Sequence, residues 1–193
     1  NSVIELINKA RKNEGIDISP LRELLEKTLN EDIIRKSNKD FGLVTVWWDK
    51  KINPHPLYIE DIPNKRLIDY LIASSSLPIF QLNRIDDKLF LDGMFFDNMP
   101  ISLLEQKGYE DIVVIRLLDD FLGKINLNKY QNINIKTIVP SAYLGGSLNK
   151  DKDNVQKNIN LGYLDAMKAY DRYEGIKYYF NVDYMFDEEY CFN

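Results

Sequence analysis

The sequence predicts an α/β fold, because strand and helix patterns alternate along the chain. The segment Phe41–Trp48 is rich in β-branched and aromatic residues, which is typical of a buried strand. Ile112–Ile115 is continuously apolar, as expected of a strand that is covered on both faces. From Asn154 to about Arg172, apolar residues recur at helical spacing and predict a long helix. We therefore expect an α/β sandwich.

Two helices are predicted before the first strand. Ser2 and Glu5 have the spacing of a capping box, and apolar residues at helical spacing follow until Gly15. Ser19-Pro20 is a second helix start, because proline is tolerated in the first turn of a helix. Leucines then repeat at helical spacing up to Leu29, which predicts a helix with one apolar face.

Prolines interrupt the pattern after the first strand. The run Asn53–Pro56 contains two prolines around His55, the only histidine, and should form a turn because proline cannot continue a ladder of hydrogen bonds. A structural or exposed His55 fits this position better than a catalytic one. The other predicted elements are a strand at 57–59, a helix face at 67–72, a strand at 88–91, a short helix at 102–107 closed by Gly108, and a strand at 133–139.

The charge balance argues against some partners. The chain has 25 basic and 30 acidic residues, a formal net charge of -5, and no dense run of Lys and Arg that could follow a phosphate backbone. We therefore expect no nucleic-acid partner. The same balance disfavours strong docking on anionic lipid, although an apolar rim still allows peripheral membrane contact.

Cysteine content and hydropathy argue against a disulfide-bonded or membrane-spanning protein. Cys191 is the only cysteine, which excludes an intrachain disulfide and is compatible with a reducing compartment such as the cytoplasm. No apolar run approaches the roughly 18 to 20 residues that span a bilayer, and the start lacks a signal-peptide pattern, so we expect a soluble protein. The chain begins with Asn1 rather than Met, and we expect it to be part of a longer protein. Asn149, Asp151 and Asp153 resemble the start of a calcium loop, but helix capping is the simpler use.

The stretch from Ala73 to Pro100 is the most informative for function. It contains Ala-Ser-x-x-x-Pro at Ala73–Pro78, a strand ending in Asp92-Gly93, and Asn98-x-Pro100. This order of motifs resembles the patatin-like phospholipase family. The resemblance extends to the segments 20–22, 41–45, 144–148 and 160–163, and so covers nearly the whole chain. It implies a three-layer α/β/α patatin-like sandwich, with residues 1–193 as the C-terminal portion of one catalytic domain.

The resemblance also implies a chemistry. Patatin-like enzymes are lipid acyl hydrolases in which the serine of a Gly-x-Ser-x-Gly elbow attacks an ester and a carboxylate accepts its proton. By position that carboxylate is Asp92, and Gly93, Ser74, Pro78 and Asn98 bind substrate or shape the loops around it. The mechanism needs neither a cofactor nor a metal, and the substrate is a lipid or another acyl ester.

The sequence departs from the family in what it lacks. No Gly-x-Ser-x-Gly occurs, and neither does the glycine-rich loop that supplies oxyanion-hole N–H groups. We therefore expect the nucleophile upstream of residue 1, an incomplete sandwich, and no activity from this chain alone. Ser147 follows two glycines but lacks the second glycine of the elbow, and Met94 stands where many relatives have a small residue.

Three hypotheses remain open on the sequence. The first is the acyl hydrolase, and the second is a patatin-like binding or regulatory module without a nucleophile. The third, a nucleotide-binding α/β domain, lacks the glycine-rich phosphate fingerprints. If the upstream half is missing, the strands at 41–48 and 112–115 should be partly uncovered. We expect that the upstream half stays bound as a separate chain, that two copies pair through the exposed region, or that the chain rearranges locally. In each case Asp92 should lie at the end of a strand, near a cleft that opens toward the missing elbow.

Overall fold

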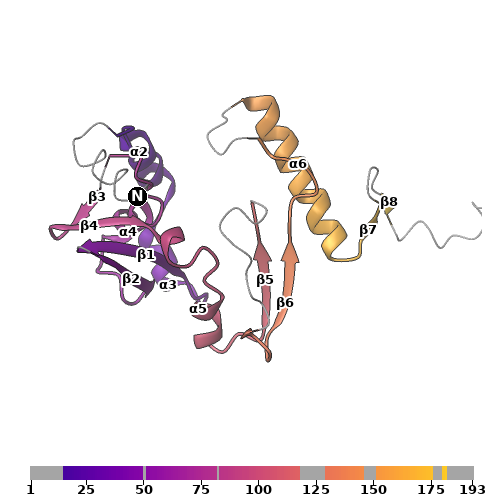
Figure 1. Cartoon of the computed structure of the whole chain (residues 1–193), viewed down its shortest axis with the longest axis horizontal. Coiled ribbons are helices and arrows are strands. Elements are labelled where there is room, and N and C mark those ends of the chain that lie inside the picture. The colour runs from indigo at the N-terminus through magenta and orange to yellow at the C-terminus, as the bar shows by residue number, and fades with distance from the viewer. Residues whose placement is uncertain are drawn as a thin grey trace, which may run out of the picture. The chain divides into compact units, whose positions relative to one another are not determined.

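The computed structural model describes residues 15–49, 51–81, 83–117, 129–145, 151–175 and 180–181. The chain divides into two compact units, Asn1–Leu103 and Leu104–Asn193 (Figure 1). Helices and strands occur in both units, which confirms the prediction of a mixed α/β protein. The assignment of all 193 residues to one catalytic domain stays a prediction. The helix expected from Ser2, the glycine-serine pair Gly146-Ser147 and Cys191 lie outside the described residues.

The first unit is built on an antiparallel sheet of four strands in the order β2-β1-β4-β3. The strands are β1 (Gly42–Asp49), β2 (Lys51–Tyr58), β3 (Asn83–Ile85) and β4 (Lys88–Asp92). Strands β1 and β4 confirm the predicted strands at 41–48 and 88–91. Strand β3 was not predicted, because three residues are too few to show an alternating pattern.

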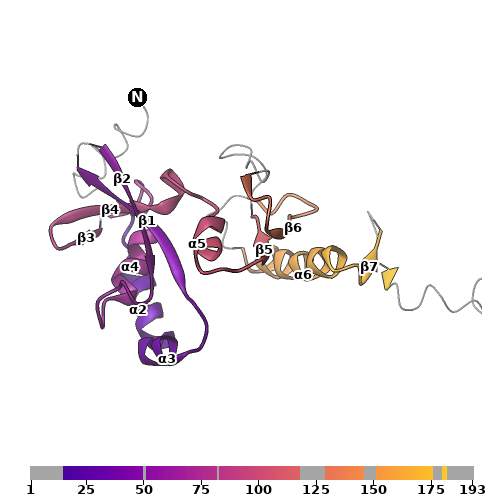
Figure 2. The same ribbon diagram turned by 90° about the horizontal axis from the view of Figure 1, so that it is seen from below.

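Helices α2 (Ser19–Thr28), α3 (Glu31–Lys36) and α4 (Leu67–Ser74) gather on one side of this sheet (Figure 2). Helix α4 packs against β1, β3 and β4, and α2 packs against α4. Both α2 and α4 were predicted, whereas α3 was not. Asn30 begins α3 by accepting a hydrogen bond from the N–H of Ile33, at 3.2 Å.

The sheet is covered on both faces along β1. On the α4 side, Leu43 lies in a buried cluster with residues such as Tyr70 and Phe90, and on the other side Val46 packs with Leu89 and Leu91. Leu43–Val46 is buried throughout, and β1 has a paired strand on each edge. The prediction that this strand would be partly uncovered is therefore wrong.

The prediction of a turn at Asn53–Pro56 is also wrong, because these residues lie within β2. Strand β2 is at an edge of the sheet, where a proline that faces outward removes no ladder bond. Pro54 and Pro56 are exposed, and the His55 ring between them lies 6.3 Å from that of Tyr70 and 5.9 Å from that of Phe90. Burial, with a smaller effect of the Lys88 ammonium, lowers the pKa of His55, so this side chain packs as a neutral ring.

Strands β3 and β4 are joined by a two-residue turn at Asp86 and Asp87. Both residues have positive φ, 49° and 64°, and the flanking Ile85 and Lys88 are paired across the ladder. Positive φ at both central positions defines a type I′ turn, whose twist matches that of the strands. Arg84 Nη1 stabilises the turn by donating to the carbonyl of Asp87 at 2.9 Å.

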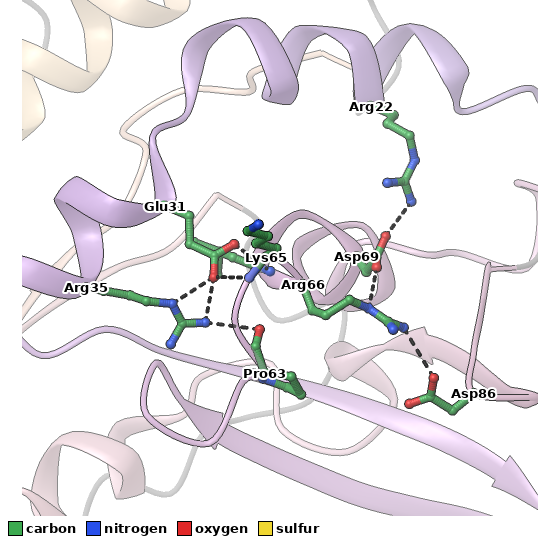
Figure 3. Close-up of polar contacts among 9 residues, drawn as sticks. Arg22, Glu31, Arg35, Pro63, Lys65, Arg66, Asp69 and Asp86 are labelled. Atoms are coloured by element: carbon green, nitrogen blue, oxygen red, sulfur yellow. Dashed lines mark hydrogen bonds and ion pairs between the residues drawn. The ribbon is translucent and has the colours of Figure 1, made fainter.

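A network of ion pairs connects α2, α4 and this turn (Figure 3). Asp69 of α4 accepts from Arg22 of α2 at 2.9 Å, and its other oxygen lies 2.7 Å from Arg66 Nε, close enough for an ion pair but off-axis for a hydrogen bond. Arg66 also reaches Asp86 at 3.5 Å. The network gives Arg22 a structural role, since it holds α2 against α4.

A second polar cluster fixes the chain between β2 and α4 (Figure 3). Glu31 accepts from the main-chain N–H groups of Lys65 and Leu67, at 2.9 and 3.1 Å, and so caps the start of α4. Arg35 bonds to Glu31 at 2.7 Å and donates to three main-chain carbonyls of residues 59–63. Burial opposes the charge on Glu31, but the bonds from Arg35, Leu67 and Lys65 outweigh it and lower the pKa of this carboxyl.

The second unit contains a parallel strand pair and a long helix. Strands β5 (Asp111–Ile115) and β6 (Asn134–Ile138) pair in parallel, and α6 (Lys152–Ala169) packs on β6. These elements confirm the strands and the helix that the sequence predicts here. The helix α5 (Ile101–Gln106) and the short strands β7 (Tyr173–Glu174) and β8 (Phe180–Asn181) complete the described elements.

The continuous apolar run of β5 predicted a strand that is covered on both faces, but only one face is covered. Ile112 and Val114 are buried, whereas Val113 is 46% and Ile115 69% exposed. For this strand the prediction of a partly uncovered face is confirmed. Asp151 caps α6 by accepting from the N–H of Asp153 at 2.8 Å, which confirms helix capping as the use of Asp151, while Asn149 lies outside the described residues. None of the helices in the described ranges has the length and apolar content needed to cross a bilayer.

Candidate active site

Asp92 lies at the end of β4, one of the two inner strands of the four-stranded sheet. It is the last residue of β4, and its side chain caps the short helix η1 (Gly93–Phe95) by accepting from the N–H of Met94 at 2.8 Å. The main-chain N–H of Asp92 donates to the carbonyl of Ser76 at 2.9 Å. Main chain and side chain are thus both fixed, and the carboxylate projects from a strand end.

Burial governs the electrostatics of this carboxyl. Asp92 is half-buried, and burial raises the pKa of its carboxyl above the ordinary value, while the hydrogen bond from Met94 offsets only part of that effect. A carboxylate with a raised pKa is a stronger proton acceptor than an exposed one. Met94, the departure from the family pattern, takes part here through its main-chain N–H, which any residue but proline would supply.

Gly93 is explained by a close approach between two main chains. A Cβ atom at this position would lie 2.2 Å from the carbonyl oxygen of Val44 and 2.7 Å from its carbonyl carbon. Both distances are far below van der Waals contact, and the opposing atoms belong to the main chain of β1. Glycine is therefore required for the chain to turn from β4 into η1 against β1.

The other predicted site residues differ in how they relate to Asp92. Ser74, the last residue of α4, donates its hydroxyl hydrogen bond to the carbonyl of Val44 at 2.7 Å, so it meets Gly93 at the same atom. Pro78 is buried in the segment that follows α4, two residues after the Ser76 carbonyl that holds Asp92. Asn98 is exposed in the bend after η1. The structure therefore brings Ser74 and Gly93 together with Asp92, whereas Asn98 lies on the surface.

Thr45 is a residue of this region that the sequence prediction missed. Its exposed fraction is 0%, it lies opposite Asp92 in the β1–β4 register, and its hydroxyl donates to the carbonyl of Leu91 at 2.7 Å. The signal in the sequence was a single hydroxyl residue within the apolar run Leu43–Val46. A buried polar side chain in such a run needs a hydrogen-bond partner, but only the register shows which one.

Two further features lie elsewhere. A cavity of about 460 Å³ is lined by residues of the segments 35–40 and 59–60, and not by Asp92. A cleft at Asp92 therefore stays a prediction. Over the described ranges, no group of three or more acidic, histidine or cysteine side chains is arranged to hold a metal ion.

Comparisons with known proteins agree with the motifs. The sequence model of a family described as Patatin-like phospholipase matches residues 4–104, just over half of the chain, and this match includes all five predicted site residues. Comparisons with curated proteins and with solved structures gave no match. Membership of this family points to lipid substrates and to acyl-ester hydrolysis in general. The chain belongs to the patatin-like phospholipase family.

Proposed function

We propose that this chain supplies the general base of a Ser-Asp dyad in a lipid acyl hydrolase. Asp92 is the base, and the nucleophilic serine lies upstream of residue 1 in a Gly-x-Ser-x-Gly elbow. The observation that carries the proposal is the state of the Asp92 carboxylate, which is half-buried, fixed by Met94, and raised in pKa by burial. A base needs this combination of fixed position and proton affinity.

The proposed reaction follows from the properties of a carboxylate. A serine hydroxyl attacks an ester carbonyl only when a group within hydrogen-bond reach takes its proton, and Asp92 accepts that proton as the Oγ–C bond forms. The protonated Asp92 then returns the proton to the departing alcohol, leaving an acyl-serine. Asp92 then takes a proton from a water molecule as that water attacks the acyl carbon, and it returns the proton to the serine oxygen as the fatty acid leaves. Histidine has no part in this sequence of steps.

The serines nearest to Asp92 support an upstream nucleophile. The hydroxyl of Ser74 donates to the carbonyl of Val44, that of Ser75 to the carbonyls of Leu71 and Ile72, and that of Ser76 to Ile72 as well. Each hydroxyl is therefore directed at main chain and acts in the structure around α4.

The proposal includes the missing part of the domain. In a three-layer patatin-like sandwich, the upstream half would add strands and helices that cover the apolar face of β5, where Val113 and Ile115 are exposed. We propose that this half, rather than a second copy of the chain, covers it. Because lipid substrates reside in bilayers, the proposal also includes peripheral membrane contact by the complete protein.

Asp92→Asn in the complete protein tests the role of the carboxylate. An amide keeps the shape and can still accept from Met94, but it cannot take the serine proton, so turnover of a p-nitrophenyl ester should fall by about 10²- to 10⁴-fold. Asp97→Asn is the matched control, because Asp97 likewise accepts from a main-chain N–H two residues ahead, that of Met99 at 3.0 Å. Near wild-type turnover by folded Asp92→Asn contradicts the assignment.

The position of the nucleophile has a separate test. The chain of 193 residues alone should neither hydrolyse esters nor react with a fluorophosphonate probe. The complete protein should be labelled at one serine upstream of residue 1. Labelling of the isolated chain at one discrete serine, together with hydrolysis, contradicts an upstream nucleophile and leaves the role of Asp92 to the first test.

A further inference from the structure

The ladder between β1 and β4 stops at Asp92, and two hydroxyl groups bind the carbonyls on either side of that point. In an antiparallel pair, alternate residues direct their main-chain groups to opposite neighbours. The N–H of Asp92 is directed away from β1, to the carbonyl of Ser76. The carbonyls of Leu91 on β4 and Val44 on β1 instead point into the space between these two strands.

Val44 lies beside Gly93 at this end of the ladder. Its carbonyl faces Gly93, where β4 has already turned into η1, and the hydroxyl of Ser74 donates to it at 2.7 Å. An intramolecular hydrogen bond contributes about 0.5–1.5 kcal/mol, so the Ser74 hydroxyl stabilises the point at which the strand ends. The bond also ties the last residue of α4 to β1.

Thr45 acts on the strand that carries the base. Its hydroxyl donates at 2.7 Å to the carbonyl of Leu91, the residue directly before Asp92, and the pair is fully enclosed. A threonine side chain has few rotamers, so this bond fixes the main chain of Leu91, and of the residue after it, relative to β1. Thr45 and Ser74 thus fix the main chain on both sides of Asp92-Gly93, and neither of these two hydrogen bonds involves the carboxylate.

We propose that Thr45 and Ser74 are positioning residues for the Asp92 carboxylate. The inference rests on the proposed function, because it matters for turnover only if Asp92 is the base. Loss of either hydroxyl lets the strand end shift, and a catalytic group displaced by about 1 Å loses roughly 10²-fold in rate. Since each hydroxyl donates to a main-chain carbonyl, the effect should fall on kcat and leave KM unchanged.

The test uses the complete protein with Thr45→Val, which keeps the shape but removes the hydroxyl, and Thr45→Ser, which restores it. Thr45→Val should lower kcat about 10- to 100-fold at constant KM, and Thr45→Ser should recover most of it. Ile62→Val is the matched control, because Ile62 is 2% exposed in the buried cluster on the α4 side, of which Asp92 is not a member. Ile62→Val should lower the melting temperature by about 2–4 °C, as Thr45→Val should, but it should leave kcat unchanged.

A double-mutant cycle separates positioning from general stability. In an Asp92→Asn background, Thr45→Val should cause no further loss of the residual rate, because it acts through the carboxylate. If Thr45→Val does not fold, Ser74→Ala decides, with the same expected split between kcat and KM. Wild-type kcat in either folded variant, or an equal further loss in the Asp92→Asn background, overturns the inference. An active Asp92→Asn single variant instead overturns the proposed function itself.

Discussion

Gly93→Ala tests how closely the Asp92 turn lies against β1. The added Cβ would be 2.2 Å from the carbonyl oxygen of Val44, whereas ordinary contacts begin at 3.4 Å, so the two main chains must separate by about 3.4 minus 2.2, or 1.2 Å. The neighbour cannot rotate away, because β1 is paired with β2 on one edge and β4 on the other.

The expected magnitude follows from that displacement. Overpacking of a well-packed region costs about 1–3 kcal/mol, and the upper half of this range applies because the clash is with main chain. Urea denaturation should therefore show an unfolding free energy about 2–3 kcal/mol lower for Gly93→Ala. In the complete protein, kcat should fall about 100-fold, since Asp92 moves with residue 93.

Gly162→Ala is the control for the glycine substitution itself. Gly162 lies within α6, and a Cβ there meets nothing within 4 Å. Alanine should stabilise the helix by about 0.5–1 kcal/mol because it restricts the unfolded chain more than glycine does. An unfolding free energy of Gly93→Ala within about 0.5 kcal/mol of wild type, with kcat unchanged, refutes the reasoning from close approach.

Three further predictions concern stability. Burial raises the pKa of Asp92, so the contribution of this carboxyl to stability is present below the ordinary value of 3.8 and is lost as pH rises through the folded value. Asp92→Asn should therefore melt at a higher temperature than wild type at about pH 7, and the difference should close near pH 3. An unchanged melting temperature at about pH 7 contradicts this. Bonds from Arg35, Leu67 and Lys65 lower the pKa of Glu31 against the effect of burial, so its contribution is present above 4.5 and is lost as pH falls through the folded value. Glu31→Gln should cost about 1–3 kcal/mol at pH 7 and flatten the loss of stability in acid, and equal acid titrations by circular dichroism contradict this. Asp87→Gly should stabilise the chain by about 0.5–1 kcal/mol in urea, because glycine adopts the φ of 64° without strain, and a destabilised variant argues against the type I′ turn.

The elements with long, regular patterns could be predicted from the sequence. Helices α2, α4 and α6 have apolar residues at helical spacing, strands β1 and β4 are compact apolar runs, and each element lies where its pattern placed it. The errors concern properties that depend on neighbours. Asn53–Pro56 belongs to a strand because β2 is at an edge, and the position of a strand in the sheet order is absent from local sequence.

The same division holds at the candidate site. The motif around Asp92-Gly93 identified the residues, but its meaning differs from the one expected of an Asp-Gly turn, since Gly93 is required by the approach to Val44 rather than by a positive φ. Thr45 could not be placed beside Asp92, because cross-strand partners follow from the register of β1 and β4. The sequence did not show that Val113 and Ile115 form the exposed face of β5, because a continuous apolar run does not indicate which face is covered.

The edge strands of the four-stranded sheet have a consequence for self-association. An open edge with free N–H groups invites a strand from another molecule, which is the first step toward fibrils. Pro54 and Pro56 leave β2 without donors at two outward positions, and β3 at the opposite edge is only three residues long. Neither edge offers a template long enough for an incoming strand. The first unit is thus protected from growing by strand addition, whereas β5 exposes the apolar side chains of Val113 and Ile115.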